Sequence, residues 1–403
     1  MTDKMLSSVK ALECCHLVAG PYCSKLLVDL GAEVVKIEQP GAADPARQRG
    51  PFLNDIPHPE RSGLFLYLNT NKLGITLNLE DHKGKDIFLK LVESVDILIE
   101  DQRPGFWGGL GLGYEQLKKV NGSLVMTSIT PFGQTGPYHS FKCYPINLFH
   151  AGGEGYLTPG WGGYDPDRPP LRAGRYVGEY ESGLSAAVAT LGAFYWQQVT
   201  GKGQHVDVSQ QQSLMALNPG EIRYYPNLGA VASRATRTLS FGGILPCKDG
   251  YVELSIYEEH QWQALLKLMG EPEWAKQDKF KDRLSRTQNN AELNFLLAGW
   301  FKQHTKEELY QQGQALGVPI APYNNTREVV ASPQLAHRAF FVEIEHSETG
   351  RVRYPSAPYQ FSRTPWRAER PAPLLGQHNG EIYGKRLGFS RQQIVKLRHA
   401  GVI

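Results

Sequence analysis

Residues 9–38 read VKALECCHLVAGPYCSKLLVDLGAEVVKIE, and they predict the architecture of the chain. The first seven residues of this stretch are mostly apolar and predict a buried strand, and EVVKIE at residues 33–38 predicts a second one. Residues 22–30 between them predict a helix, and Gly31 stands where glycine commonly follows a helix end. A strand, a helix and a strand in this order predict a unit of a parallel α/β sheet.

The alternation of strands and helices continues beyond this unit. It predicts an α/β fold with an open, Rossmann-like sheet. The further elements that we expect are helices at 86–92, 114–119 and 182–197 and strands at 95–99, 124–129 and 205–209.

The pattern changes after about residue 225. Residues 250–256 predict an alternating strand, and amphipathic helices rich in Gln, Lys and Glu follow. We therefore expect three parts: residues 1–225 as the first part of a large Rossmann-like domain, residues 226–325 as a small α+β domain, and residues 326–403 as a linker and a Pro-punctuated final segment.

The composition is that of a globular protein of 403 residues, with 41% apolar and 21% charged residues. The net charge of +3 and the lack of a basic run argue against nucleic acid as a partner. No stretch approaches the ~20 apolar residues of a membrane span, and the start of the chain lacks the apolar core of a secretory signal. The five cysteines are irregularly spaced without a CxxC pair, so we expect reduced thiols and a cytoplasmic protein.

Other kinds of site find little support in the sequence. The twelve histidines show no HxxxH or HExxH spacing, which argues against a dedicated zinc site. The glycine-rich residues 108–113 neither follow a strand directly nor precede a Walker lysine, so phosphate-loop binding is not expected.

Glu179 stands at the head of an apolar helix, four residues before Gly183. A carboxylate is a competent covalent nucleophile, and the N-terminal end of a helix favours its ionised form. A carboxylate at this place can also serve the helix alone, and Glu181 is a second candidate two residues further on. The residues by themselves leave these readings open.

The chain resembles the class III CoA-transferases, the family of formyl-CoA transferase, carnitine CoA-transferase and α-methylacyl-CoA racemase. The resemblance rests on segments that occur in the family's order: residues 16–21 (HLVAGP), 30–38 (LGAEVVKIE), 71–72 (NK), 103–105 (RPG), 110–114 (LGLGY), 132–138 (FGQTGPY), 200–204 (TGKGQ), 249–251 (DGY), 317–319 (GVP) and 374–376 (LLG). It implies a large Rossmann-like domain made from both chain ends, a small inserted α+β domain, and two chains interlocked in a homodimer.

The resemblance also implies a function. Glu179 matches the aspartate with which the transferases of this family attack an acyl thioester. We therefore expect an acyl-CoA:carboxylate CoA-transferase that works through anhydride and thioester intermediates on Glu179. Its partners would be an acyl-CoA donor and a carboxylic acid acceptor, with coenzyme A as co-substrate and no permanently bound cofactor.

The resemblance assigns further residues to the site. His16, Val18 and Ala19 match the turn that offers backbone N–H groups to an oxyanion, as a turn leading into a helix can do. Gly242 and Gly243 match a glycine-rich flap that some members carry over the site. Tyr144 stands where the racemases have a histidine, and because Glu179 replaces their aspartate, racemisation is not expected. The residues matched to CoA contacts are Lys72, Asp101, Gln102, Arg103 and Lys142.

Some positions depart from the family pattern. Gly109 and Gln39 replace residues that help to bind CoA phosphates, and Asp101 could repel a phosphate, so we expect weak CoA binding. These departures leave two alternatives: a family member adapted to another acyl transfer or isomerisation, and a catalytically silent paralogue. The aromatic residues Tyr156, Trp161 and Tyr164 suggest a bulky acyl group.

Overall fold

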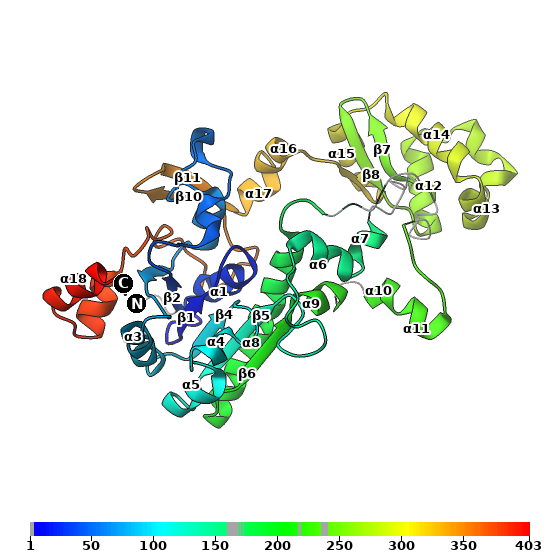
Figure 1. The fold of residues 1–403 in the computed structure, drawn as a ribbon. Helices are drawn as coiled ribbons and strands as arrows, with labels where there is room; N and C mark the ends of the chain where they lie inside the picture. The colour runs from blue at the N-terminus through cyan, green and yellow to red at the C-terminus, as the bar shows by residue number, and fades with distance from the viewer. Residues whose placement is uncertain (1–3, 159–168, 170, 172, 217–218, 235–240) are drawn as a thin grey trace. The chain divides into compact units, whose positions relative to one another are not determined.

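The computed structural model describes residues 4–158, 169, 171, 173–216, 219–234 and 241–403. The chain divides into two compact units (Figure 1). The first unit comprises residues 1–154, 173–219 and 338–403, and the second comprises residues 155–172 and 220–337. The chain thus leaves the first unit twice and returns to it twice. The expected residues Trp161 and Tyr164 lie outside the described residues.

The first unit contains a six-stranded parallel sheet. Its strands are β1 (Lys10–Cys14), β2 (Glu33–Glu38), β3 (Leu73–Thr76), β4 (Ile97–Glu100), β5 (Val125–Thr130) and β6 (His205–Ser209). Their order is β3-β2-β1-β4-β5-β6, and every neighbouring pair is parallel. The order reverses between β1 and β4, and ligands of open α/β sheets bind in the crevice at the carboxyl ends of the strands at such a point.

Helices cover both faces of this sheet (Figure 1). The helices of the first unit, and the two that cross its boundaries, are α1 (Ala19–Asp29), α2 (Gly63–Leu68), α3 (His82–Val92), α4 (Phe106–Gly109), α5 (Tyr114–Val120), α6 (Pro145–Ala151), α7 (Glu154–Leu157), α8 (Val177–Thr200), α9 (Gln210–Ala216), α10 (Pro219–Ile222) and α18 (Arg391–His399). One apolar core lies between the sheet and α1 and α8, and the other lies between the sheet and α3 and α5. Because both faces are covered, β4 and β5 are buried along their whole length.

The helices α1 and α8 approach each other closely. A Cβ atom on Gly183 of α8 would lie 2.5 Å from the carbonyl oxygen of Ala19, so only glycine fits this contact. The buried small residues Ala186 and Ala187 continue the close packing along α8. Because α1 follows β1 and α8 precedes the parallel strand β6, both helices begin at the carboxyl edge of the sheet.

The final segment of the chain, residues 338–403, is part of the first unit. It contains the hairpin β10 (Phe341–His346) and β11 (Gly350–Pro355), the π-helix η5 (Gly380–Arg386) and α18. The hydroxyl of Tyr383 donates to the carbonyl of Thr76 at 2.6 Å, and the N–H of Thr76 donates to the side-chain oxygen of Asn379 at 2.9 Å. These contacts cover the free edge of β3, which would otherwise expose unpaired backbone groups. Two short 3-10 helices, η1 (Pro45–Gln48) and η2 (Leu53–Asp55), complete this unit.

The second unit is built around a three-stranded antiparallel sheet. Its elements are β7 (Gly243–Cys247), β8 (Gly250–Leu254), β9 (Ile320–Pro322), α11 (Tyr224–Leu228), α12 (Glu259–Leu268), α13 (Arg283–Gln288), α14 (Asn290–Phe301), α15 (Lys306–Leu316), α16 (Thr326–Val330), α17 (Pro333–His337), and the 3-10 helices η3 (Glu273–Lys276) and η4 (Asp278–Phe280). Its core gathers aromatic side chains, and the buried guanidinium of Arg286 lies 4.7 Å from the ring of Trp262.

Three helices begin earlier than the sequence predicts, and one of them, expected at 86–92, starts at His82. The other two lie at the candidate site. The helix expected at 22–30 starts at Ala19, so part of the expected turn is helical. The helix expected at 182–197 starts at Val177, which places Glu179 inside its first turn. Both shifts bring residues of the candidate site onto helix starts at the carboxyl edge. Among the described residues, no helix has both the length and the apolar composition needed to cross a membrane.

Candidate functional site

The turn after β1 is tied to the end of β4 at the point where the strand order reverses. The backbone N–H of His16 donates to Asp101 Oδ2 at 2.7 Å, and His16 Nδ1 lies 3.2 Å from Asp101 Oδ1. The amide nitrogen of Gln102 lies 3.2 Å from the same imidazole nitrogen. Burial lowers the pKa of His16, but the hydrogen bond and the charge of Asp101 outweigh it and raise this pKa above its usual value. Three of the predicted site residues therefore form one hydrogen-bonded group.

The turn itself has an unusual backbone. Leu17 has a φ of 58°, in the left-handed region that residues with a Cβ rarely occupy. Its N–H donates to Asp44 Oδ1 at 2.9 Å. Val18 then caps α1, its side chain is buried, and no side chain of the described residues caps this helix end. The N–H groups at the start of α1 are thus available to a ligand rather than to a capping side chain.

Glu179 lies in the first turn of α8, beside the start of α1. The flanking residues Tyr176 and Tyr180 pack in the same apolar cluster as Val18, and the rings of Tyr180 and Tyr22 meet edge to face at 4.8 Å. Together with the contact of Gly183 with α1, this packing fixes the start of α8 against the turn. The first turn of a helix favours a negative charge, and Glu179 is the acidic residue in the first turn of α8.

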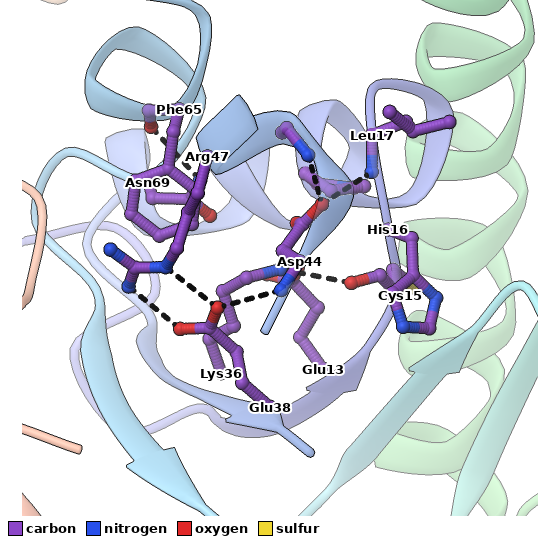
Figure 2. Close-up of polar contacts among 12 residues, drawn as sticks. Glu13, Cys15, His16, Leu17, Lys36, Glu38, Asp44, Arg47, Phe65 and Asn69 are labelled. Carbon is purple, nitrogen blue, oxygen red and sulfur yellow. Dashed lines mark hydrogen bonds and ion pairs between the residues drawn. The ribbon is translucent and has the colours of Figure 1, made fainter. Parts of the chain in front are cut away.

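A group of buried charges lies under the turn (Figure 2). Lys36 Nζ lies 2.7 Å from Glu13 Oε1 and 2.9 Å from Asp44 Oδ2, and it donates to the carbonyl of Cys15 at 2.9 Å. Burial lowers the pKa of Lys36, but the carboxylates of Asp44 and Glu13 raise it well above its usual value. Burial raises the pKa values of Glu13 and Asp44, but the charge of Lys36 and the hydrogen bonds that each carboxylate accepts, joined at Glu13 by the charge of Lys72, together lower them below their usual values. All three groups are therefore charged at neutral pH.

Lys72 belongs to this buried group rather than to an open phosphate site. It is fully buried, and its ammonium donates to Glu13 Oε2 at 2.7 Å, to the carbonyl of Pro21 at 2.9 Å and to Asn69 Oδ1 at 3.0 Å. Burial lowers its pKa to about 8. All three protons of the ammonium are used, so this arrangement leaves Lys72 none to donate to a CoA phosphate. The structure supports a structural role for Lys72 under the start of α1.

A cavity of about 220 Å³ opens beside His16. Its polar lining includes His16, Gln39, Gln102 and Glu80, and its apolar lining includes Trp107. No lysine or arginine of the described residues lines it. The cavity joins the ends of β1, β2 and β4, so it lies in the crevice where the fold predicts a ligand. The polar residues that line the cavity are neutral or acidic. This agrees with the expectation that Gln39 replaces a residue that helps to bind CoA phosphates.

Arg103 lines a different hollow. It is exposed and borders a groove of about 480 Å³ together with Tyr114, Gln134 and His205. At the base of this groove Ser128 Oγ lies 2.8 Å from His205 Nε2. The buried carboxyl of Glu100 also lines the groove, and burial raises the pKa of Glu100 to about 7.

The remaining predicted residues lie on exposed or separate segments. Lys142 and Tyr144 are exposed, and the N–H of Tyr144 donates to Asn147 Oδ1 at 3.0 Å at the start of α6. Tyr156 is exposed on α7. Gly242 and Gly243 belong to the second unit, where the N–H of Gly242 donates to Asn294 Oδ1 at 2.8 Å and Gly243 begins β7. Both glycines have positive φ, and a Cβ on Gly242 would lie 2.5 Å from the carbonyl oxygen of Leu254.

Sequence reasoning missed the carboxylate that contacts the turn from below. Asp44 lies in the loop before η1, and its side chain accepts from the N–H groups of both Leu17 and Ala46. The sequence did contain a signal for a buried ion-pair network. Glu13 and Lys36 are charged residues inside strands that are buried on both faces, and such residues need charged partners. Among the described residues, no group of His, Cys, Asp and Glu side chains could hold a metal ion.

The chain is similar to known proteins along nearly its whole length. The model of CoA-transferase family III matches residues 6–379. Subunit BbsE of succinyl-CoA:(R)-benzylsuccinate CoA-transferase from Thauera aromatica is 32% identical over 395 residues, which cover 95% of this chain and 95% of that protein. Succinyl-CoA:glutarate CoA-transferase from Homo sapiens is 32% identical over 406 residues, which cover 99% of this chain and 90% of that protein.

A solved structure is similar along nearly the whole chain. The crystal structure of a CAIB/BAIF family protein from Brucella suis superposes with a TM-score of 0.83 and 29% sequence identity. The superposition covers 94% of this chain and 98% of that one. The similarity therefore extends over both units of the chain.

Proposed function

The chain belongs to CoA-transferase family III and is a CoA-transferase, and on this premise we propose that Glu179 is the covalent nucleophile that moves CoA between two carboxylic acids. The observation that carries the proposal is the place of Glu179 in the first turn of α8, which Gly183 holds against the start of α1. A carboxylate can act as the covalent nucleophile on a thioester, and free N–H groups at a neighbouring helix start can stabilise the oxyanion that develops.

The reaction proceeds in four balanced displacements. The Glu179 carboxylate attacks the thioester carbonyl carbon of the donor, the C–S bond breaks, and CoA leaves as a thiolate. The thiolate attacks the carboxyl carbon of Glu179 in the resulting anhydride and releases the donor acid. The acceptor carboxylate displaces CoA from Glu179, and the thiolate then attacks the acceptor's acyl carbon and frees Glu179. No net proton is consumed.

The start of α1 supplies the oxyanion stabilisation for these steps. Within the described part of the chain no side chain caps the N–H groups of Val18 and Ala19, so they can donate to a negative oxygen. Removing one such donor typically costs about 10²–10³ in rate. The cavity beside His16, Gln39 and Gln102 takes part of the CoA molecule, and the binding is weak because no lysine or arginine stands among the described residues of its lining.

The substrates are dicarboxylic acids and their CoA thioesters. Two relatives named above act on succinyl-CoA according to their names, with benzylsuccinate or glutarate as the second acid. We therefore take succinyl-CoA as the first donor to test and glutarate and succinate derivatives as the first acceptors.

The working form is an interlocked homodimer. In the order of the chain, the second unit is inserted between segments of the first unit. The chain path, which leaves and re-enters the first unit twice, supports this arrangement. An exposed apolar face on α8, which includes Val188, Tyr195 and Val199, also supports it, because such a face needs a partner surface.

Mass spectrometry of the protein incubated with acyl-CoAs tests the mechanism. With succinyl-CoA we expect a species heavier by CoA minus water, which corresponds to the thioester on Glu179. Glu179→Gln should lose this species and the transfer of CoA while its melting temperature stays near that of the wild type. Transfer at the wild-type rate in Glu179→Gln would exclude the mechanism, and no labelling with any acyl-CoA would favour a silent paralogue.

Glu179→Asp measures how closely the site fits the longer side chain. The substitution withdraws the carboxylate by one methylene, and a misplacement of about 1 Å costs roughly 10²-fold in rate. We expect a loss of this size in kcat, and an unchanged kcat would mean that the site does not depend on the length of the side chain.

A further inference from the structure

Asp44 is not among the residues proposed to contact the substrate. Its carboxylate accepts a hydrogen bond from the backbone of the turn that is proposed to bind the oxyanion. We propose that Asp44 is the positioning residue that holds this turn in its active shape, with Lys36 as its counter-charge. The proposal rests on the proposed function of the turn as the oxyanion donor.

The turn has a shape that its contacts must hold. Leu17 lies in the left-handed region at φ 58°, and such a conformation persists in a residue with a Cβ only where its surroundings impose it. Two carboxylates impose it here: Asp101 accepts from the N–H of His16 at 2.7 Å, and Asp44 accepts from the N–H of Leu17 at 2.9 Å. With these two donors engaged, the N–H groups of the next residues, at the start of α1, are left for the substrate.

Asp44 itself is held by several buried contacts. Its other oxygen, Oδ2, lies 2.9 Å from Lys36 Nζ, and the N–H of Ala46 donates to Oδ1 at 2.8 Å. Its own N–H donates to Glu38 Oε2 at 3.0 Å. Asp44 and Lys36 are almost completely buried, so water does not compete for these contacts. Figure 2 shows the Asp44 carboxylate between Lys36 and the backbone nitrogen of Leu17.

Lys36 also contacts the backbone next to the turn. Besides the Asp44 carboxylate, its ammonium contacts the carbonyl of Cys15 at 2.9 Å, one residue before the turn. Arg47 continues the network, because its guanidinium bonds both oxygens of Glu38 at 2.8 Å and lies 3.7 Å from the ring of Phe65. The turn is therefore anchored at Cys15 and Leu17 by charges that are fixed to two strands and to η1.

The test compares Asp44→Ala with a matched control on the same helix. Asp44→Ala removes both the acceptor for Leu17 and the partner of Lys36. Asp29→Asn removes a buried carboxylate charge at the other end of α1, where Asp29 pairs with Lys25 at 3.0 Å and does not contact the turn. The measurements are kcat and KM with succinyl-CoA, the melting temperature, and amide hydrogen exchange of residues 15–20.

We expect Asp44→Ala to lower kcat by on the order of 10²-fold with a smaller change in KM, and to speed exchange at Leu17. Asp29→Asn should lower the melting temperature but leave kcat within about twofold and exchange in the turn unchanged. If Asp44→Ala does not fold, Asp44→Asn, which keeps the shape and one acceptor, takes its place, with an expected loss of roughly 10-fold in kcat.

The proposal is overturned if the exchange at Leu17 stays as in the wild type, or if both variants lose kcat in proportion to their loss of stability. Failure of the proposed function looks different, because the wild type itself would then form no thioester with any acyl-CoA. In that case hydrogen exchange still decides whether Asp44 holds the turn.

Discussion

The backbone N–H of His16 and its imidazole both contact the carboxylate of Asp101, at 2.7 Å and 3.2 Å. This pair joins the end of β1 to the end of β4, the two central strands between which the sheet order reverses. The sequence places Asp101 among the residues that bind or repel CoA. In the structure its two oxygens are used to hold the turn, so the pair links the fold directly to the proposed oxyanion site.

Replacing Asp101 by Asn should change the titration of His16. The charge of Asp101 raises the pKa of His16, so in Asp101→Asn the midpoint measured by NMR should fall. Because the folded-state pKa is raised, the pair stabilises the fold below the unfolded value of about 6.5 and this contribution is lost as pH rises through the folded value. The variant should therefore lose more stability at pH 6 than at pH 9. Asp96→Asn, which changes a carboxylate that accepts from Lys10 N–H, should leave the midpoint of His16 in place.

The sequence predicted the sheet better than the site, for a physical reason. The strand at 33–38 and the strand at 205–209 were predicted at both ends. Gly31 and Pro40 flank the first strand, and the tight turn at Gly201–Gly203 precedes the second. The start of α1 was predicted too late because Gly20-Pro21 is typical of a turn, although proline is tolerated in the first turn of a helix. The bond between Asp44 and Leu17 joins residues 27 positions apart, and no local pattern predicts such a contact.

Gly183→Ala should destabilise the protein and slow transfer. The new Cβ would lie 2.5 Å from the Ala19 carbonyl oxygen, a backbone atom that cannot move alone, so α8 must shift away from α1. Overpacking of this kind costs about 1–3 kcal/mol, and the shift also moves Glu179. Thermal unfolding and kcat measure the two effects.

Gly299→Ala is the control, because a Cβ there meets no atom within 4 Å and alanine should stabilise the helix by up to about 1 kcal/mol. Equal stability of both variants would contradict the close packing.

Gln39→Arg should strengthen CoA binding. The cavity beside His16 has no lysine or arginine in its described lining, and a charge-assisted hydrogen bond to phosphate contributes about 1.5–3 kcal/mol. Calorimetry with free CoA should show a Kd lowered by on the order of 10-fold. Gln392→Arg adds the same charge on the exposed surface of α18 and should change the Kd little. Sub-micromolar binding by the wild type would show that the missing cations do not weaken the site.

Glu100 should make stability depend on pH between about 4.5 and 7. Burial raises its pKa to about 7, so the folded state binds its proton more tightly than the unfolded state does. The free energy of unfolding should therefore fall as pH rises through this window, by on the order of 3 kcal/mol from this group. Glu100→Gln should remove this part of the slope in urea unfolding measured from pH 4.5 to 8. An identical slope in the variant would mean that Glu100 is ionised throughout.

An interlocked homodimer should not exchange its chains under native conditions. Leu184, Val188, Tyr195 and Val199 follow one another on α8 at helical spacing, and between 49% and 72% of each side chain is exposed in the single chain. If the partner covers this face and its chain passes between the connections of the two units, separation requires unfolding, and stability depends on association. Tagged and untagged dimers mixed under native conditions should then form no mixed species over days, but should do so after unfolding and refolding together.

Val188→Asp should reduce the yield of folded dimer, whereas Val120→Asp, on the exposed end of α5, should not. Rapid exchange under native conditions, or a stable folded monomer, would rule out the interlocked arrangement.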